Sequence, residues 1–154
     1  MVKFIGEYTA KLDDKGRLVL PSAFKSLISS EAEGRPETGM KLVLKKDIYA
    51  DCLEMYTYEE WSRQSDDLKS RLNPYNKAHA LFWREYMKGR AVVEPDGKLG
   101  RISIPKKLLD SIGVTKEVVF CGNDYKIEIW AKEKFESDGI SNDKFVSLAE
   151  ELFK

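Results

Sequence analysis

The organisation of the chain follows from one stretch, Leu12-Asp13-Asp14-Lys15-Gly16-Arg17-Leu18-Val19-Leu20-Pro21. Its second part, Gly16 to Pro21, returns 84 residues later as Gly100-Arg101-Ile102-Ser103-Ile104-Pro105. Three later blocks repeat in the same order: Leu42-Val43-Leu44 matches Val118-Val119-Phe120, Leu53-Glu54-Met55-Tyr56 matches Ile127-Glu128-Ile129-Trp130, and Trp61 matches Phe135. Ordered blocks of this kind indicate an internal duplication.

Each copy of the repeat has the pattern of a small α+β unit. A strand at about 8–12 or 91–93 enters a turn rich in Asp, Lys and Gly, and a second strand leaves at Arg17 or Arg101, which is typical of a hairpin. Pro21 and Pro105 cannot continue a central strand but suit the start of a helix. Two further strands follow, and in the first copy Thr57 with Glu60 fits a helix capping box. The predicted unit is β-β-α-β-β-α.

A four-stranded unit of this size would leave exposed strand edges, and two units can cover each other's edges by interleaving. We therefore expect an α+β fold with a closed β-barrel core, made of two tandem pseudo-symmetric units that form one compact domain. The predicted ranges are 1–72 for the first repeat, 73–90 for a connector helix and 91–136 for the second repeat. A C-terminal amphipathic helix over 137–154 could pack on its own barrel or on a neighbouring subunit.

Charge is balanced overall but distributed unevenly. The 154 residues carry no net charge, which argues against a monomer that coats nucleic acid by bulk charge. From Arg84 to Lys116 there are eight basic and four acidic residues, whereas Glu31 to Asp67 has five basic and ten acidic residues. A carboxylate at Glu7 precedes any apolar run, and no apolar run reaches about 18 residues, so we expect a cytoplasmic protein without a cleaved signal.

Two cysteines, Cys52 and Cys121, stand far apart in strand-like apolar stretches. This spacing suggests neither a disulfide framework nor a zinc motif, and we interpret both as small buried hydrophobic residues. The single histidine, His79, falls on the connector helix and is interpreted as a surface or packing residue. With no phosphate-binding glycine loop and no metal-ligand spacing in the sequence, we expect no cofactor, no metal and no enzymatic activity.

A family resemblance rests on Phe4-Ile5-Gly6-Glu7, on Leu12 to Pro21 and on Gly100 to Pro105. These segments resemble the hallmark segments of the MraZ family of transcriptional regulators, which is related to AbrB-like factors. The resemblance covers roughly residues 3–136. It implies two SpoVT-AbrB-like repeats in a double-split, swapped-hairpin barrel flanked by helices. It also implies a cytoplasmic, nucleoid-associated regulator that binds double-stranded DNA at short repeated operator elements, restrains the division and cell-wall gene cluster, and forms a homo-oligomeric ring, an octamer or larger.

By this resemblance the family's D-x-x-x-R motif falls on Asp13 and Arg17. The second copy, Asp96 to Arg101, is one residue longer, so its acidic position requires an enlarged turn. A guanidinium at a hairpin tip can reach a phosphate or guanine O6 and N7, which makes Arg17 and Arg101 the candidates for base reading. The aspartates would position the arginines.

The lysines Lys11, Lys15 and Lys98 are candidates for less directional phosphate contacts. The competing interpretation is that Asp and Gly are ordinary turn residues and that an exposed Asp–Arg pair contributes only about 0–1 kcal/mol. Linked hairpins on a ring would raise affinity by effective concentration when the DNA repeats match their separation. The main alternative is an oligomeric interaction or scaffold protein that has lost operator recognition, for which the altered second turn is the motive. An antitoxin-like role fits a tandem repeat less well.

Overall fold

The computed structural model describes residues 2–34 and 39–154, and its elements follow the predicted duplicated order. The first repeat comprises β1 (Glu7–Lys11), β2 (Arg17–Val19), α1 (Ser22–Glu33), β3 (Leu42–Lys46), β4 (Leu53–Thr57) and α2 (Tyr58–Ser70). The connector contains α3 (Lys77–Met87). The second repeat comprises β5 (Ala91–Val93), β6 (Arg101–Ser103), α4 (Lys106–Ser111), β7 (Glu117–Asn123), β8 (Lys126–Ala131) and α5 (Lys132–Ser137), and α6 (Asn142–Leu152) follows. The predicted α+β class and the duplication are confirmed.

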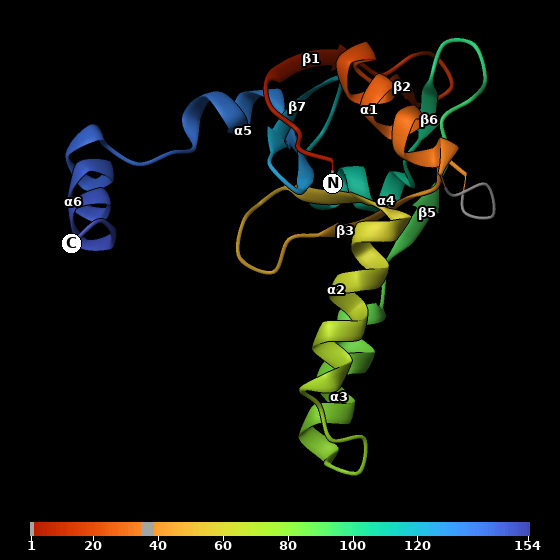
Figure 1. Cartoon of the computed structure of the whole chain (residues 1–154). Helices are drawn as coiled ribbons and strands as arrows, with labels where there is room; N and C mark the ends of the chain where they lie inside the picture. Colours follow the sequence, from red (N-terminus) through yellow and green to blue (C-terminus); the bar gives the residue numbers. More distant parts are fainter. Residues whose placement is uncertain (1, 35–38) are drawn as a thin grey trace.

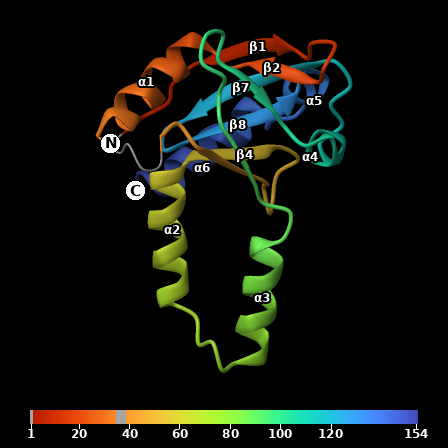
Figure 2. The same cartoon turned by 90° about the vertical axis from the view of Figure 1, so that its right-hand side faces the viewer.

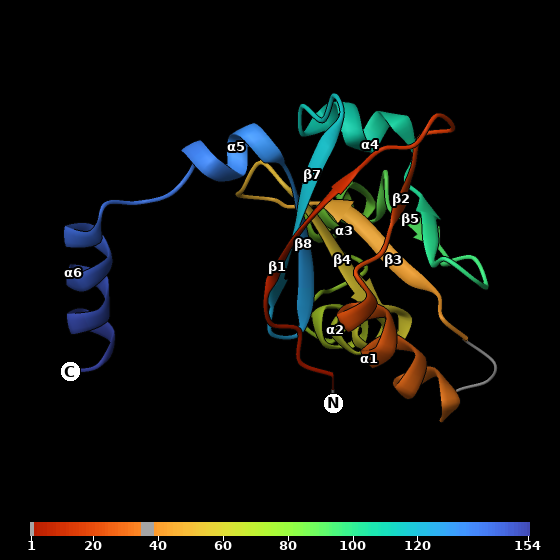
Figure 3. The same ribbon diagram turned by 90° about the horizontal axis from the view of Figure 1, so that it is seen from above.

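The strands of the two repeats are exchanged. A six-stranded sheet has the order β1-β7-β8-β4-β3-β5, so the first strand of each repeat pairs with a strand of the other repeat. All of its neighbouring strands are antiparallel. The order is symmetric about the β8–β4 pair, because exchanging the two repeats maps the sheet onto itself. Figure 3 shows β1 lying beside β7, and β5 beside β3, at the two sides of the sheet.

The predicted closed barrel is wrong, because the six-stranded sheet is open. Strands β1 and β5 are its edges, and no described strand joins them. The remaining strands, β2 and β6, pair only with each other as a separate two-stranded ribbon. The two strands of each predicted hairpin therefore do not pair with each other. The strand before the turn belongs to the sheet, and the strand after the turn belongs to the ribbon. Closure would require a continuous ladder around the barrel.

The core lies between the sheet, the ribbon and helices α1 and α4. Leu18 and Ile102 at the centre of the ribbon are fully buried, and they belong to one hydrophobic cluster with Phe24, Leu44 and Phe120. The helices α1 and α4 begin immediately after Pro21 and Pro105, as the fixed φ of proline favours. The Thr57 hydroxyl accepts a hydrogen bond from the Glu60 amide at 3.2 Å, as predicted for the capping of α2.

Helices α2 and α3 project from the sheet as an arm (Figures 1 and 2). At its base the ammonium of Lys45 donates hydrogen bonds to the backbone oxygens of Glu85, Tyr86 and Lys88 at 2.6, 2.5 and 2.8 Å. These are carbonyls at the end of α3, where cations are favoured. The guanidinium of Arg90 lies over the ring of Tyr86, 4.6 Å from its centroid. Cations thus join the end of α3 to the sheet.

The C-terminal segment differs from the prediction of one helix over 137–154. Helix α5 ends at Ser137 and α6 begins at Asn142, after the hydroxyl of Ser141 accepts a hydrogen bond from the Lys144 amide. No residue of α6 is buried, so it does not pack on its own sheet. Among the described residues, none of the helices is both long and apolar enough to cross a membrane.

A buried lysine neutralises a cluster of carboxylates on the β4–β8 pair. Glu54 lies directly opposite Glu128 in this ladder, where two like charges would repel. The ammonium of Lys126 lies 2.8 Å from the Glu54 carboxylate, 3.7 Å from Glu128 and 3.6 Å from Asp47. Burial lowers the pKa of Lys126, but the carboxylates of Glu54 and Asp47 outweigh it, so that the pKa is raised. The cluster holds together the two strands on the pseudo-twofold axis.

Replacing Lys126 by Met should therefore destabilise the fold by about 3–5 kcal/mol, because it leaves carboxylates without their buried counter-ion. Urea unfolding at one fixed protein concentration measures the change. Lys132→Met is the matched control, since Lys132 pairs with Glu117 at 3.5 Å in a more exposed position and should contribute about 0–1 kcal/mol. Equal effects of the two substitutions would contradict the role given to Lys126.

Candidate nucleic-acid interface

The turn of the first hairpin is organised around the carboxylate of Asp13. Its Oδ1 accepts hydrogen bonds from the backbone amides of Lys15 at 2.9 Å and Arg17 at 2.8 Å. Its Oδ2 accepts one from Nε of the Arg17 side chain at 2.9 Å. The backbone closes the same turn, because the Asp13 amide donates to Arg17 O and the Gly16 amide donates to Asp13 O. One side chain therefore fixes both the turn and the arginine that follows it.

The second turn repeats this geometry despite its additional residue. Asp96 Oδ1 accepts a hydrogen bond from the Arg101 amide at 3.0 Å, and Oδ2 accepts one from Arg101 Nε at 2.7 Å. The backbone pairing also corresponds, with the Asp96 amide donating to Arg101 O and the Gly100 amide donating to Asp96 O. The extra residue is accommodated within 97–99. The structure thus brings Asp96 and Arg101 together in the arrangement of Asp13 and Arg17.

Both aspartates are held in their charged form. The backbone amide of Arg17 is the main cause that lowers the pKa of Asp13, and the side chain of Arg17 acts in the same direction. The pKa of Asp96 is lowered chiefly by the backbone amide and then by the side chain of Arg101. Each arginine is bound through Nε alone, and its two terminal nitrogens make no hydrogen bond to any described residue. A guanidinium whose Nε is bonded to an aspartate still has two terminal nitrogens, which can donate to a pair of acceptor atoms on another molecule.

The ribbon places the two arginines on one face. In its register Arg17 lies opposite Ser103, and Arg101 lies opposite Val19. These positions point away from the buried pair Leu18 and Ile102, which face the core. Diagonal neighbours of this kind lie roughly 7–8 Å apart across a ladder. Figures 1 and 2 show the ribbon on the side of the molecule away from the helical arm, so this face is unobstructed by α2 and α3.

Three lysines are among the residues that line a hollow of about 550 Å³ beside the ribbon. Lys11 and Lys98, both candidates from the sequence, line it, and Lys15 is exposed at the tip of the first turn. Lys25 lines it as well, and its ammonium donates to the backbone oxygen of Lys98 at 3.3 Å. No acidic residue is among the described lining residues. Lys25 was missed in the sequence because the contact joins α1 to the other repeat; its only signal was a basic position in the first turn after Pro21.

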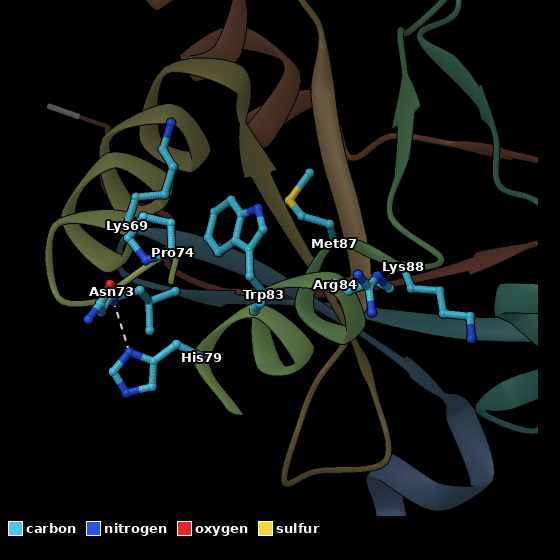
Figure 4. A pocket seen from close by; sticks show the side chains of 10 residues that line it. Lys69, Asn73, Pro74, His79, Trp83, Arg84, Met87 and Lys88 are labelled. Carbon is cyan, nitrogen blue, oxygen red and sulfur yellow. Dashed lines mark hydrogen bonds between the residues drawn. The ribbon is translucent and has the colours of Figure 1, made fainter. Parts of the chain in front are cut away.

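Two other groups of chemically capable side chains lie elsewhere. Asp47, Cys52 and Glu128 each bring one possible ligand atom within 4.8 Å of the others. The ammonium of Lys126 already supplies a positive charge to both carboxylates, and burial raises the pKa of the Cys52 thiol well above its usual range, so this group favours a structural role. His79 accepts a hydrogen bond at Nδ1 from the Asn73 amide at 2.9 Å (Figure 4), which is a packing contact within the arm.

Comparison with known proteins identifies relatives along the whole chain. A family model described as "MraZ protein, putative antitoxin-like" matches residues 3–84 and 87–148. A protein of Bacteroides fragilis named "Transcriptional regulator MraZ" is 38% identical over 154 residues, which cover 100% of this chain and 93% of the relative. Proteins of the same name from Bacteroides thetaiotaomicron and Acetivibrio thermocellus are 36% and 38% identical, over 99% and 97% of this chain and 93% and 96% of the relatives.

The turn geometry predicts different effects of alanine at two glycines. Gly16 has φ +75°, which an L-residue adopts at a cost of about 1–2 kcal/mol. Gly97 has ordinary φ and open space around its Cβ position. Gly16→Ala should therefore lower the free energy of unfolding by about 1–2 kcal/mol, whereas Gly97→Ala in the second turn should leave it nearly unchanged. Thermal and urea unfolding measure both, and a neutral Gly16→Ala would contradict the turn described here.

Proposed function

The chain belongs to the MraZ family, and we propose that it is a DNA-binding transcriptional regulator that reads operator DNA through Arg17 and Arg101 on the β2–β6 ribbon. The observation that carries this proposal is the paired arrangement of the arginines. Each is held at Nε by its own aspartate, and each leaves two terminal nitrogens unbonded to described residues. Relatives over the full chain are named transcriptional regulators, which favours regulation over catalysis.

The chemistry of the ribbon suits the major groove. This groove admits a two-stranded ribbon, and guanine presents O6 and N7 there as adjacent acceptors. The terminal nitrogens of an arginine match this pair, and the bond from Nε to the aspartate restricts the orientation of the fork. Lys11, Lys15, Lys25 and Lys98 would bind phosphates on either side and set the position of the ribbon. Base reading and backbone anchoring are thereby divided between arginines and lysines.

Affinity would come from several copies of the chain acting together. A copy with no net charge and a few phosphate contacts gains little from counterion release. Copies joined in a ring, an octamer or larger, would present repeated ribbons, and short operator repeats with matching spacing would bind them at high effective concentration. We propose that these repeats lie upstream of the division and cell-wall gene cluster, that binding represses it, and that the protein acts in the cytoplasm at the nucleoid.

The alternative is an oligomeric scaffold that has lost operator recognition. The sequence feature that suggested this alternative is the longer second turn between Asp96 and Arg101. The two turns have corresponding hydrogen bonds, which hold both arginines in the same way. The longer turn is therefore no argument that the second arginine has lost DNA recognition. DNA recognition by both repeats is therefore the better-supported function.

Replacing Arg17 or Arg101 by Ala should weaken binding to the upstream DNA of its own gene cluster about 5- to 150-fold, the effect of losing one bidentate contact of 1–3 kcal/mol. Fluorescence anisotropy at several salt concentrations, with a scrambled duplex in parallel, measures the loss. Arg63→Ala is the control, because Arg63 pairs with Glu60 on α2. Equal weak binding to both duplexes, unchanged in all variants, would favour the scaffold.

Asp13→Asn separates positioning from simple charge. The substitution removes a negative charge from the DNA-facing turn. If Asp13 did no more than repel DNA, the variant would bind every duplex more tightly than the wild type. Asparagine keeps one acceptor oxygen for the backbone amides but has an NH2 group in place of the second oxygen, which accepts from Arg17 Nε. If Asp13 positions Arg17, the ratio of operator to scrambled affinity should therefore fall several-fold. Competition titrations with the two duplexes measure this ratio. An increased affinity with an unchanged ratio would exclude the positioning role.

A further inference from the structure

Helix α6 exposes an apolar stripe that no described residue covers. Phe145, Leu148 and Leu152 are spaced for one face of a helix, and their exposed fractions are 62%, 43% and 80%. The helix lies away from the body on the segment 138–141 (Figures 1 and 3). An exposed apolar stripe on a capped, regular helix is the surface expected of an element whose packing partner is elsewhere.

A groove between α2 and α3 offers a matching surface. It measures about 810 Å³, and its apolar lining comes from Leu72, Pro74, Ala80, Trp83 and Met87. Figure 4 shows the indole of Trp83 in the middle of the groove, with Met87 on one side and Lys69 and Pro74 on the other. No residue of α3 is buried. The apolar side chains of α3 and of the turn that follows α2 therefore lack a filling element.

The charges of the two surfaces are opposite. The groove is bordered by Lys69, Arg84 and Lys88, and no acidic residue is among its described lining residues. Lys69 and Lys88 have acidic neighbours on their own helices, at 3.4 and 3.6 Å, whereas Arg84 forms no ion pair among the described residues. Helix α6 carries Asp143, Glu150 and Glu151 against Lys144, so three acidic residues less one basic residue give it a charge of −2. Complementary charge of this kind selects a partner and its register.

We propose that α6 of one copy docks into the α2–α3 groove of a neighbouring copy, with the Phe145–Leu148–Leu152 stripe against Trp83 and Met87. The contact joins two different surfaces, so each copy gives one helix and receives another. Heterologous contacts of this kind build rings when the rotation closes. The inference rests on the proposed oligomer and assigns the surfaces that assemble it. In Figure 1 α6 and the arm project from the body in different directions, which favours exchange between copies.

Cross-linking between two full-length chains tests the contact directly. One chain carries Ala80→Cys in the groove and the other carries Leu148→Cys on α6, with different tags and with Cys121→Ser in both; Cys52 is buried. After the chains are co-expressed, a short bismaleimide should yield a cross-linked species that carries both tags. Each single-cysteine chain alone is the control. A cross-link found only when both cysteines are in one chain would show that α6 folds back on its own arm, and would overturn the proposal.

Point variants test the docking of α6 separately from the existence of the oligomer. Leu148→Asp should reduce the oligomer to smaller species in light scattering, whereas Ser147→Asp, on the opposite face of α6, should not. Arg84→Glu should weaken assembly at least several-fold, and Glu151→Arg in the same chain should restore it. An intact oligomer in all variants, without the mixed cross-link, would overturn the docking site and leave the oligomer standing. A monomeric wild type would overturn both. Circular dichroism verifies the fold of each variant.

Discussion

The pairing of β2 with β6 is the constraint on which the rest of the structure depends. Each of these strands has three residues, too short to be stable alone, and they pair across the pseudo-twofold axis with Leu18 and Ile102 buried beneath them. Because the second strand of each hairpin is used in this ribbon, the first strand is free to pair with the other repeat's sheet. The same alternation that buries Leu18 and Ile102 turns Arg17 and Arg101 outward. The pairing of β2 with β6 thus determines both the exchange of strands between the repeats and the outward position of the two arginines.

Symmetry about this axis also creates a difficulty. A duplicated chain brings equivalent residues together on the axis, and equivalent charges repel: Glu54 meets Glu128 in the β4–β8 ladder. The repeats have diverged at this point. Lys126 in the second copy supplies the cation, 2.8 Å from Glu54, at the position where the first copy has Cys52. The glutamates themselves keep equivalent donors, because the Tyr56 hydroxyl donates to Glu54 at 2.7 Å and Trp130 Nε1 donates to Glu128 at 3.0 Å. The ion cluster therefore depends on differences between the repeats, while the hairpins depend on their similarity.

The parts that the sequence predicts are those controlled by local chemistry. The turn residues, Pro21, Pro105 and the Thr57–Glu60 cap act over a few positions, and the structure places helices and turns where these residues indicate. The pairing of Asp96 with Arg101 could be expected only by assuming an enlarged turn. Barrel closure depends on strand curvature and pairing over the whole sheet, which no local pattern encodes, and that prediction was wrong. The contact of Lys25 with Lys98 spans 73 residues, so a single sequence carries almost no signal for it.

A neutral chain that binds a polyanion must separate its charges in space. Here arginines and lysines lie at the ribbon and its turns, while the carboxylates of Asp13 and Asp96 are committed to hydrogen bonds with the arginines and the turns. Their charge weakens attraction to DNA in general, but it restricts the direction in which each guanidinium can bind. Such a surface loses affinity for arbitrary sequences and keeps affinity for correctly placed acceptors. Low affinity per copy then becomes useful, because only an array of matching sites can hold an array of copies.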